Sequence, residues 1–217
     1  MNVIVVIPAY NEAKNIKSVI KQVKQHIQTV LVIDDASTDN TSKVAKAAGA
    51  TVITQQTNQG AGAATRTGLK KALELGATHI ITLDADGQHN PNDIPKLLRF
   101  AKKYDVVIGS RMINPKGMPL SRKFFNKAGS LITWLLYGIY VKDSQTGFKL
   151  FSHHAARKMK ITFNRYEFCS EILYRIRKNK LTFKEVPIQV IYTKESLAKG
   201  QNFFNGVKMV WRMVHHR

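Results

Sequence analysis

The feature that most constrains this chain is a short apolar run that stops abruptly at two carboxylates and a glycine. The run Ile80–Leu83 is followed at once by Asp84, Ala85, Asp86 and Gly87. Such a run predicts a buried parallel strand, because strands covered on both faces are apolar throughout. Ligands of open α/β sheets bind beyond the carboxyl ends of the strands, so we expect Asp84 and Asp86 to face a binding site.

Two carboxylates this close repel each other unless a proton or a cation lies between them. Mg²⁺ and Mn²⁺ prefer hard oxygen ligands, and Mg²⁺ is commonly held by one or two carboxylates together with substrate phosphates. The pair therefore indicates a metal–diphosphate site. The alternative is a polar turn at a strand end, since Asp and Gly are also common turn residues.

The apolar segments around this run predict an α/β fold with a mostly parallel sheet. The expected strands cover residues 3–7, 30–33, 51–54, 80–83 and 106–108. Segments with apolar residues at helical spacing follow these strands, and the one after the acidic pair is expected over residues 93–103. This alternation is typical of right-handed crossover units that place helices on both faces of the sheet.

The second half of the chain follows a different pattern. We expect a long apolar helix with a basic start at 120–140, a polar loop at 143–149, a helix around 165–179, an alternating strand at 183–192 and a basic, aromatic helix at 202–217. No linker divides the chain, so we predict a single domain over residues 1–217. Its second half, residues 112–217, is expected to be an attachment at the carboxyl edge of the sheet.

The strongly basic composition limits the possible partners. The chain has 34 Lys and Arg against 14 Asp and Glu, a net charge of +20, which predicts an acidic partner such as a phosphorylated substrate, an anionic membrane or a nucleic acid. Nucleic acid is disfavoured, because acids at several strand ends would repel a phosphate backbone. The single Cys169 favours a reducing, cytoplasmic setting. The longest apolar run, 131–141, is shorter than the ~20 residues that span a bilayer.

Three strand ends carry the acidic and aromatic groups, namely Pro8–Glu12, Asp34–Asp39 and Asp84–His89. In combination they resemble the family 2 glycosyltransferases, and within them the polyprenol-phosphate (dolichol-phosphate) mannosyl- and glucosyltransferase branch. The loop Asp143–Lys149 is a further signature of that branch, and the resemblance covers residues 1 to about 150. It implies a GT-A-type Rossmann-like fold, a nucleotide-sugar donor, a divalent metal ion and inversion at the anomeric carbon.

The resemblance assigns the donor site to the first half of the chain, residues 1–111. It implies that Pro8, Tyr10 and Glu12 flank the base and ribose of the donor and that Asp35 hydrogen-bonds the base. The segment around Asn58 and Gly60 also matches a family motif, where a backbone turn would shape the pocket.

The same resemblance assigns roles to the acidic pair. Asp84, with Ala85 beside it, would face the ribose or the sugar, while Asp86 and Gln88 would ligate Mg²⁺ or Mn²⁺ on the diphosphate. Asp84 and Asp86 are therefore candidate catalytic residues. The family's basic closing motif is diverged in residues 192–201, and Lys194 is expected to take the place of a donor-binding arginine.

The acceptor half, residues 112–217, offers its own candidates. Arg111 and Arg122 suit phosphate contact through their planar guanidinium groups, with Arg111 facing both donor and acceptor. Gln145 and Thr146 are expected to bind the acceptor. Asp143 either orients the acceptor loop or acts as a general base, because a hydroxyl acceptor needs a base and a phosphate, already anionic, does not.

The expected activity is transfer of a hexose, first mannose or glucose, from a GDP- or UDP-sugar to a polyprenyl or dolichyl phosphate. A soluble or glycan hydroxyl acceptor is one alternative. A sugar nucleotidyltransferase is another, and it is disfavoured because Pro8–Glu12 stands where that class has a glycine-rich basic loop. Basic residues mixed with Trp, Phe and Leu in 120–140 and 202–217 predict peripheral binding to the cytoplasmic face of a membrane. Packing on the sheet or in a dimer interface is the alternative for these helices.

Overall fold

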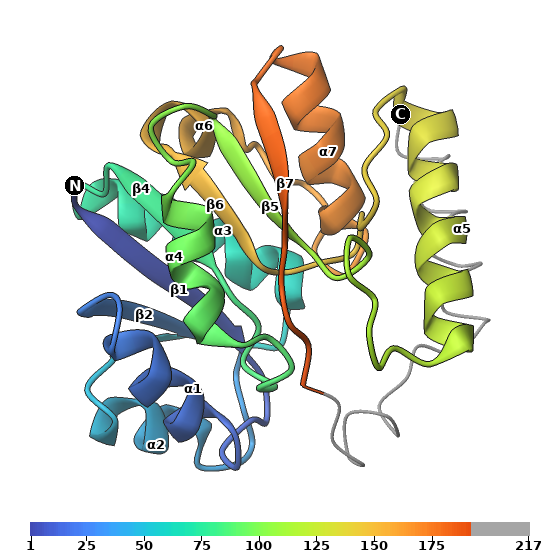
Figure 1. Cartoon of the computed structure of the whole chain (residues 1–217). Coiled ribbons are helices and arrows are strands. Elements are labelled where there is room, and N and C mark those ends of the chain that lie inside the picture. Colours follow the sequence, from blue (N-terminus) through green and yellow to red (C-terminus); the bar gives the residue numbers. More distant parts are fainter. Residues whose placement is uncertain (192–217) are drawn as a thin grey trace.

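The computed structural model describes residues 1–191, and its centre is a twisted sheet (Figure 1). The strands of these residues are β1 (Val3–Ala9), β2 (Thr29–Asp34), β3 (Thr51–Thr54), β4 (His79–Thr82), β5 (Val106–Ser110), β6 (Lys149–Ser152) and β7 (Phe183–Pro187). Their spatial order is β3-β2-β1-β4-β6-β5-β7. All neighbours are parallel except that β6 runs antiparallel to β4 and β5. The expected α/β fold with a mostly parallel sheet is confirmed.

Helices cover both faces of the sheet, as expected (Figure 1). They are α1 (Ile16–Lys24), α2 (Thr41–Ala47), α3 (Ala61–Glu74), the short 3₁₀ turn η1 (Pro91–Asp93), α4 (Ile94–Leu98), α5 (Leu120–Tyr137), α6 (His153–Lys158) and α7 (Phe168–Lys178). Side chains of a strand alternate between faces, so Val5 and Ile7 of β1 join α1, α2 and α4, whereas Ile4 and Val6 join α3, α6 and α7.

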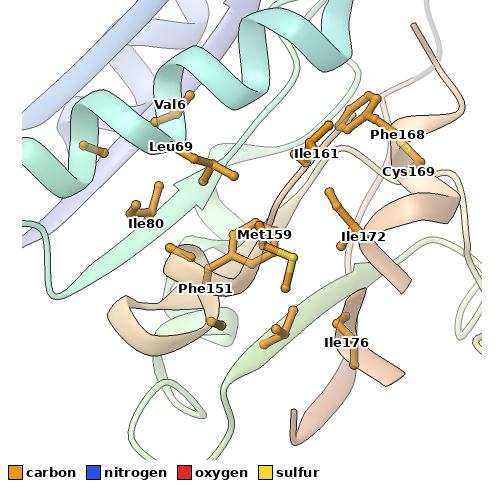
Figure 2. Close-up of a cluster of buried hydrophobic side chains, with 14 of the residues drawn as sticks. Val6, Leu69, Ile80, Phe151, Met159, Ile161, Phe168, Cys169, Ile172 and Ile176 are labelled. Atoms are coloured by element: carbon orange, nitrogen blue, oxygen red, sulfur yellow. The ribbon is translucent and has the colours of Figure 1, made fainter. Parts of the chain in front are cut away.

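The second of these cores ties the two halves of the chain together. Figure 2 shows Val6, Leu69 and Ile80 from the first half facing Phe151, Met159 and residues of α7 such as Ile172. Burying each large aliphatic side chain stabilises the fold by roughly 1.5–3 kcal/mol. The core thereby holds residues 159–167, between α6 and α7, next to the amino end of α3.

The structure differs from the sequence prediction where tertiary contacts determine which helices and strands form and where they end. The strand β6 lies between β4 and β5, and neither β6 nor α6 was predicted, because a four-residue buried strand that starts with a lysine has no distinctive period. The strand β7 ends at Pro187, which cannot donate to a ladder hydrogen bond. The helix α5 ends at Tyr137, since Gly138 adopts φ +65°. The helix predicted at 202–217 and Lys194 lie outside the described residues.

Candidate active site

The loops after β1 and β2 are joined into one unit at the carboxyl edge of the sheet. The side-chain carbonyl of Asn11 accepts from the Thr38 backbone N–H at 2.8 Å, and the Asn11 N–H donates to Ser37 Oγ at 2.9 Å. Glu12 N–H donates to Thr41 Oγ1 at 2.8 Å. Asn11 adopts φ +54°, a left-handed conformation that Asn tolerates. These bonds bring together two of the three strand ends that the sequence singled out.

Asp35 fixes the loop that precedes α3. It is buried, and its two carboxylate oxygens accept from the backbone N–H groups of Gln59 at 2.9 Å and Gly60 at 2.7 Å. Gly60 has φ +101°, and a Cβ there would lie 2.5 Å from the carbonyl oxygen of Asn164. These two hydrogen bonds give Asp35 a structural role. Each of its oxygens has a further lone pair, which remains available to a ligand. The side chain of Tyr10, directly after β1, is 45% exposed beside these loops.

The acidic pair follows β4 and carries an excess of negative charge. Withdrawal from water raises the pKa of both Asp84 and Asp86, and each is raised further by neighbouring acids, Asp143 and Glu12 for the first, Asp84 and Glu12 for the second. Asp86 accepts from Gln88, through the backbone N–H at 2.9 Å and the side-chain amide at 2.6 Å. These bonds only partly offset the repulsion within the pair.

Two basic residues, Lys149 and Arg111, and the uncharged His89 lie near the pair. Lys149 is 1% exposed, its Nζ donates to the carbonyl of Thr146, and its charge, with that of Arg111, favours ionisation of Asp84. His89 Nδ1 lies 3.5 Å from Asp84 Oδ2, but burial lowers the pKa of His89 to about 4. His89 is therefore uncharged near neutral pH and does not neutralise the pair.

Asp143 is fully buried, and its electrostatics are the opposite of those of the pair. Arg111 donates to it through the backbone N–H at 2.9 Å, Nε at 2.6 Å and Nη2 at 2.7 Å. Burial opposes the charge of Asp143, but the Arg111 guanidinium and its hydrogen bonds outweigh burial and lower the pKa of that carboxyl. A carboxylate held in this way is a weak proton acceptor and a firm anchor for an arginine.

Gly147 brings the 143–149 loop directly onto the acidic pair. A Cβ at this position would lie 2.1 Å from Asp84 Oδ1, so only a glycine allows the loop backbone to approach the carboxylate this closely. The hydroxyl of Thr82, at the end of β4, donates to the Gly147 carbonyl at 2.7 Å. The expected donor and acceptor halves therefore meet at Asp84 and Gly147.

The other acceptor candidates take part in internal hydrogen bonds. The amide of Gln145 donates to Ser144 Oγ at 3.4 Å and Ser170 Oγ at 3.3 Å. Thr146 is buried, and its hydroxyl accepts from the backbone N–H of Phe148 at 3.2 Å. Both residues shape the loop that Gly147 brings onto Asp84.

The chemistry of the acidic pair fits a divalent cation. Within residues 1–191 no three His, Cys, Asp or Glu side chains are arranged as a ready-made metal site. Mg²⁺ does not require one, because it binds to one or two carboxylates and completes its shell with phosphates and water. The carboxylate of Asp86 and the side-chain oxygen of Gln88 are ligands of this kind. A cation would also remove the remaining repulsion between Asp84 and Asp86.

Sequence reasoning missed three groups that border this site. His89 and Lys149 lie within motifs that were recognised but were given no role. Tyr166 had no sequence signal and is 62% exposed, yet partial withdrawal from water and the charges of Asp84 and Asp86 raise the pKa of its phenol, which is therefore within electrostatic reach of the pair. It arrives there because the backbone N–H groups of Gly62 and Ala63 donate to the Asn164 carbonyl, at 2.8 and 3.2 Å.

Comparisons with known proteins show the family to which the chain is similar. A family model described as glycosyl transferase family 2 matches residues 4–160. The chain is 42% identical to the UDP-N-acetylglucosamine–dolichyl-phosphate N-acetylglucosaminyltransferase of Methanococcus voltae, over 96% of this chain and 93% of that protein. It is 30% identical to the undecaprenyl-phosphate mannosyltransferase of Micrococcus luteus, over 88% of this chain and 84% of that protein.

Among solved structures, the chain resembles glucosyl-3-phosphoglycerate synthase from Mycobacterium tuberculosis in complex with Mn²⁺, UDP and phosphoglyceric acid. The TM-score is 0.74, with 18% sequence identity, over 98% of this chain and 76% of that one. The same enzyme has also been solved with Mg²⁺ and UDP. At this level of identity the likeness concerns the fold, and it confirms the GT-A type of α/β architecture.

Proposed function

The chain belongs to glycosyl transferase family 2, and on this basis we propose that it transfers a sugar from a nucleoside diphosphate sugar to a polyprenyl or dolichyl phosphate. The observation that carries the proposal is the contact of Gly147 with Asp84, which joins the acceptor loop to the acidic pair of the donor side. Two relatives whose names specify lipid phosphates as acceptors, at 42% and 30% identity, support this choice of acceptor.

The donor is proposed to lie between the β1, β2 and β4 loops. Pro8, Tyr10 and Glu12 would flank its base and ribose, and Asp35 would accept from the base with the lone pairs that Gln59 and Gly60 leave available. The sugar is proposed to be a hexose or an N-acetylhexosamine. Mannose and glucose were the sequence expectation, and the Methanococcus voltae relative makes UDP-N-acetylglucosamine the first donor to test.

The metal is proposed to be Mg²⁺ or Mn²⁺, held by Asp86 and Gln88 together with the donor diphosphate. When bound, such an ion neutralises the charge that develops on the departing nucleoside diphosphate. The chain's own contribution is to hold Asp84 and Asp86 at the carboxyl end of β4. Arg122 Nη1 also donates to Gln88 Oε1 at 3.3 Å, which orients the side chain of that proposed ligand.

On the acceptor side, Asp143 is proposed to orient Arg111, which then receives the acceptor phosphate together with Arg122. The low pKa of Asp143 and its hydrogen bonds to Arg111 argue against a general base at this position. A phosphate acceptor does not need one, because its second pKa is about 6 and it is a dianion for much of the time near neutral pH. A hydroxyl acceptor would need another residue to take its proton.

The membrane is proposed to contact α5. Its exposed residues include Leu120, Phe124, Leu131 and Leu135, which are 81%, 69%, 49% and 67% exposed. These positions follow helical spacing and form one face, which we call the outer face of α5. No helix within residues 1–191 is long and apolar enough to cross a membrane. We propose peripheral binding on the cytoplasmic side, with 202–217 as a second contact, because basic residues mixed with Trp, Phe and Leu at helical spacing are typical of interfacial helices.

The test is a transfer assay with GDP- and UDP-sugars, Mn²⁺ or Mg²⁺, and a polyprenyl phosphate in vesicles. We expect a sugar to appear on the extractable lipid. Gly147→Ala should lower transfer by about 100-fold, since a displacement of the order of 1 Å at Asp84 can have that effect. Gly129→Ala is the matched control, because its Cβ would meet nothing closer than 3.6 Å. Pyrophosphate release or a water-soluble glycoside in place of the lipid product would refute the proposal.

A further inference from the structure

The helix α5 has the reverse of the usual distribution of side chains. A helix on a protein surface normally turns its apolar face inward, as α1 does with Ile16, Val19 and Ile20. The fully buried residues of α5 are Ser130 and Thr133, and Tyr137 at its end is partly buried against the core, whereas Leu120, Phe124, Leu131 and Leu135 form the outer face. Figure 1 shows α5 at the side of the molecule, next to α7 and away from the sheet.

The first two turns of α5 contact the proposed substrate-binding residues. Arg122 donates to Gln88, the proposed metal ligand, at 3.3 Å. One turn further, Asn126 Oδ1 accepts from Arg111 Nη2 at 3.5 Å. The polar face of the helix therefore reaches both the β4 loop and the arginine that holds Asp143.

The next turn contacts the acceptor loop. Ser144 N–H donates to Ser130 Oγ at 3.3 Å, and the hydroxyls of Ser130 and Ser144 lie 3.4 Å apart. Thr133 Oγ1 lies 3.1 Å from Ser170 Oγ on α7, and that hydroxyl also accepts from the amide of Gln145. Arg122, Asn126, Ser130 and Thr133 are spaced four, four and three residues apart, so they form one stripe, which we call the inner face of α5.

These contacts leave the position of α5 weakly determined by the protein itself. Tyr137 anchors the last turn of α5 against the core and Tyr174, but the turns before it bury only the two small polar residues Ser130 and Thr133. These residues bury little apolar area, and apolar burial is the main source of packing free energy. Elements with few buried apolar contacts have low local stability. A bilayer that covers the outer face would supply the missing burial, and by immobilising the helix it would lower the entropy that is lost when the acceptor loop binds its substrate.

We propose that Ser130 and Thr133 are positioning residues through which membrane contact at the outer face of α5 orders the acceptor loop, residues 143–149. The proposal rests on the proposed function in one respect, namely that the outer face of α5 lies on lipid. It goes further in making the bilayer an activator of the site as well as the location of the acceptor.

Charge favours an anionic lipid surface as the occupant of the outer face. Lys123 and Lys127 lie in the same turns as Phe124, and the chain as a whole carries a net charge of +20. Near an anionic leaflet each basic residue adds ~1 kcal/mol of attraction. A second copy of this chain would bring a charge of the same sign against these lysines and would be repelled.

The activity test separates the membrane from the acceptor. The acceptor is a five-carbon prenyl phosphate, which stays in water, and the vesicles are acceptor-free phosphatidylglycerol or phosphatidylcholine. We expect the anionic vesicles to lower the KM for this acceptor by about tenfold, the scale of a modest population shift. Thr133→Val and Ser130→Ala should still float with the vesicles but lose most of this stimulation, whereas Thr133→Ser, which keeps the hydroxyl, should retain it.

A second readout does not depend on catalysis. Amide hydrogen exchange in residues 143–149 should slow when anionic vesicles are added to the wild type, and should not change in Thr133→Val. Leu135→Ser should lose vesicle binding and the slowing together. Leu75→Ser is the matched control, because Leu75 is 47% exposed on a different helix end.

The outcomes distinguish this proposal from the proposed function. Absence of transfer to any prenyl phosphate would refute the function, and the exchange measurement would still test the coupling. Vesicle binding by the wild type without a change in KM or in exchange would show that α5 is an anchor only, and would overturn the coupling. Three other results would also overturn the coupling. They are full stimulation of Thr133→Val by the vesicles, a dimer formed through the outer face of α5, and occupation of that face by residues 192–217.

Discussion

The two acidic centres of the site, the Asp84–Asp86 pair and Asp143, differ in how the protein treats their charge. Asp143 is fully buried, yet its pKa is lowered, because Arg111 donates to both of its oxygens. The pair lies a few residues from β4, and its pKa values are raised, because burial and the neighbouring acids outweigh the opposing charges of Lys149 and Arg111 on Asp84. The chain therefore compensates the negative charge of Asp143 fully and that of the Asp84–Asp86 pair only in part.

The difference separates a structural carboxylate from a ligand-binding one. A buried acid whose partners all come from the chain contributes to stability and to the placement of Arg111. Acids that are held close together without enough positive charge reduce the stability of the free protein, and they persist where a ligand supplies the compensation. The comparison therefore supports the proposals that a cation and the donor diphosphate bind at the Asp84–Asp86 pair and that Asp143 orients Arg111.

The largest expected effect is on stability, from Asp143→Ala. Removing Asp143 takes from Arg111 the carboxylate that it binds in a buried ion pair, and such a loss typically lowers the free energy of unfolding by about 3–5 kcal/mol. Urea denaturation of the full chain, read as a shift of the midpoint at constant slope, measures this. Should the variant not fold, Asp143→Asn provides the measurement. A loss below about 1 kcal/mol would show that the charge of Asp143 is not compensated by Arg111 in the way described.

The next effect is on donor binding, from Asp86→Asn. Loss of the charged ligand should weaken Mn²⁺-dependent binding of the nucleotide sugar by at least about 100-fold, roughly 2.7 kcal/mol. The metal-free variant should be no less stable than the wild type, because the substitution removes a repelling charge. Calorimetry with and without Mn²⁺ gives the first quantity and urea denaturation the second. Asp105→Asn, at the opposite edge of the sheet, is the control, and unchanged affinity in Asp86→Asn would refute the metal assignment.

The sequence located both centres but could not distinguish them. Asp84 and Asp86 could be placed at a strand end because an apolar run precedes them, and the crossover pattern implied which strand ends converge. The environment of Asp143 depends on Arg111, 32 residues away, and on the antiparallel strand β6 that carries the loop into the sheet. A local sequence pattern does not encode such a contact. The sequence therefore left two roles open for Asp143, general base and orienting group.

The same limit applies to α5. Its apolar residues were recognised from the sequence, and the membrane interface was predicted with packing on the sheet as the alternative. Which face is buried was not predictable, because Ser130 and Thr133 find their partners, Ser144 and Ser170, on segments distant in the chain. The direction of the apolar face is a tertiary result, and it favours the membrane prediction without testing it.

Asp35 provides an intermediate case, and Asp35→Ala should have an intermediate effect. The substitution leaves the N–H groups of Gln59 and Gly60 without their acceptor, at ~1–3 kcal/mol, and removes the proposed contact with the base. Nucleotide affinity should fall by about one to two decades. Binding of UDP and GDP by calorimetry is the measurement. Asp35→Asn retains one carbonyl oxygen and should lose less, and normal binding in Asp35→Ala would make this residue purely structural.

The smallest effect tests the comparison most directly, because the two centres should respond to pH in opposite directions. The pKa of Asp143 is lowered in the fold, so its contribution to stability is present above the ordinary carboxyl pKa of about 4 and is lost as the pH falls through the lower, folded value. The pKa values of the pair are raised, so the stability of the protonated pair is present at low pH and is lost as the pH rises through the raised values.

The measurement is the difference in free energy of unfolding between wild type and variant, in EDTA, at pH 5 and at pH 8. The free energy of unfolding of Asp86→Asn should increase relative to that of the wild type as the pH rises, since only the wild type then carries both charges of the pair. Asp143→Asn should show its full deficit at both pH values, because both lie above its folded pKa. His89 is common to all three proteins, so the differences largely exclude it. Mn²⁺ with a nucleotide sugar should reverse the sign for Asp86→Asn alone, because the ligand stabilises a site that only the wild type retains. A pH-independent difference for Asp86→Asn would mean that the pair is already neutralised within the chain, and the contrast between the two centres would not hold.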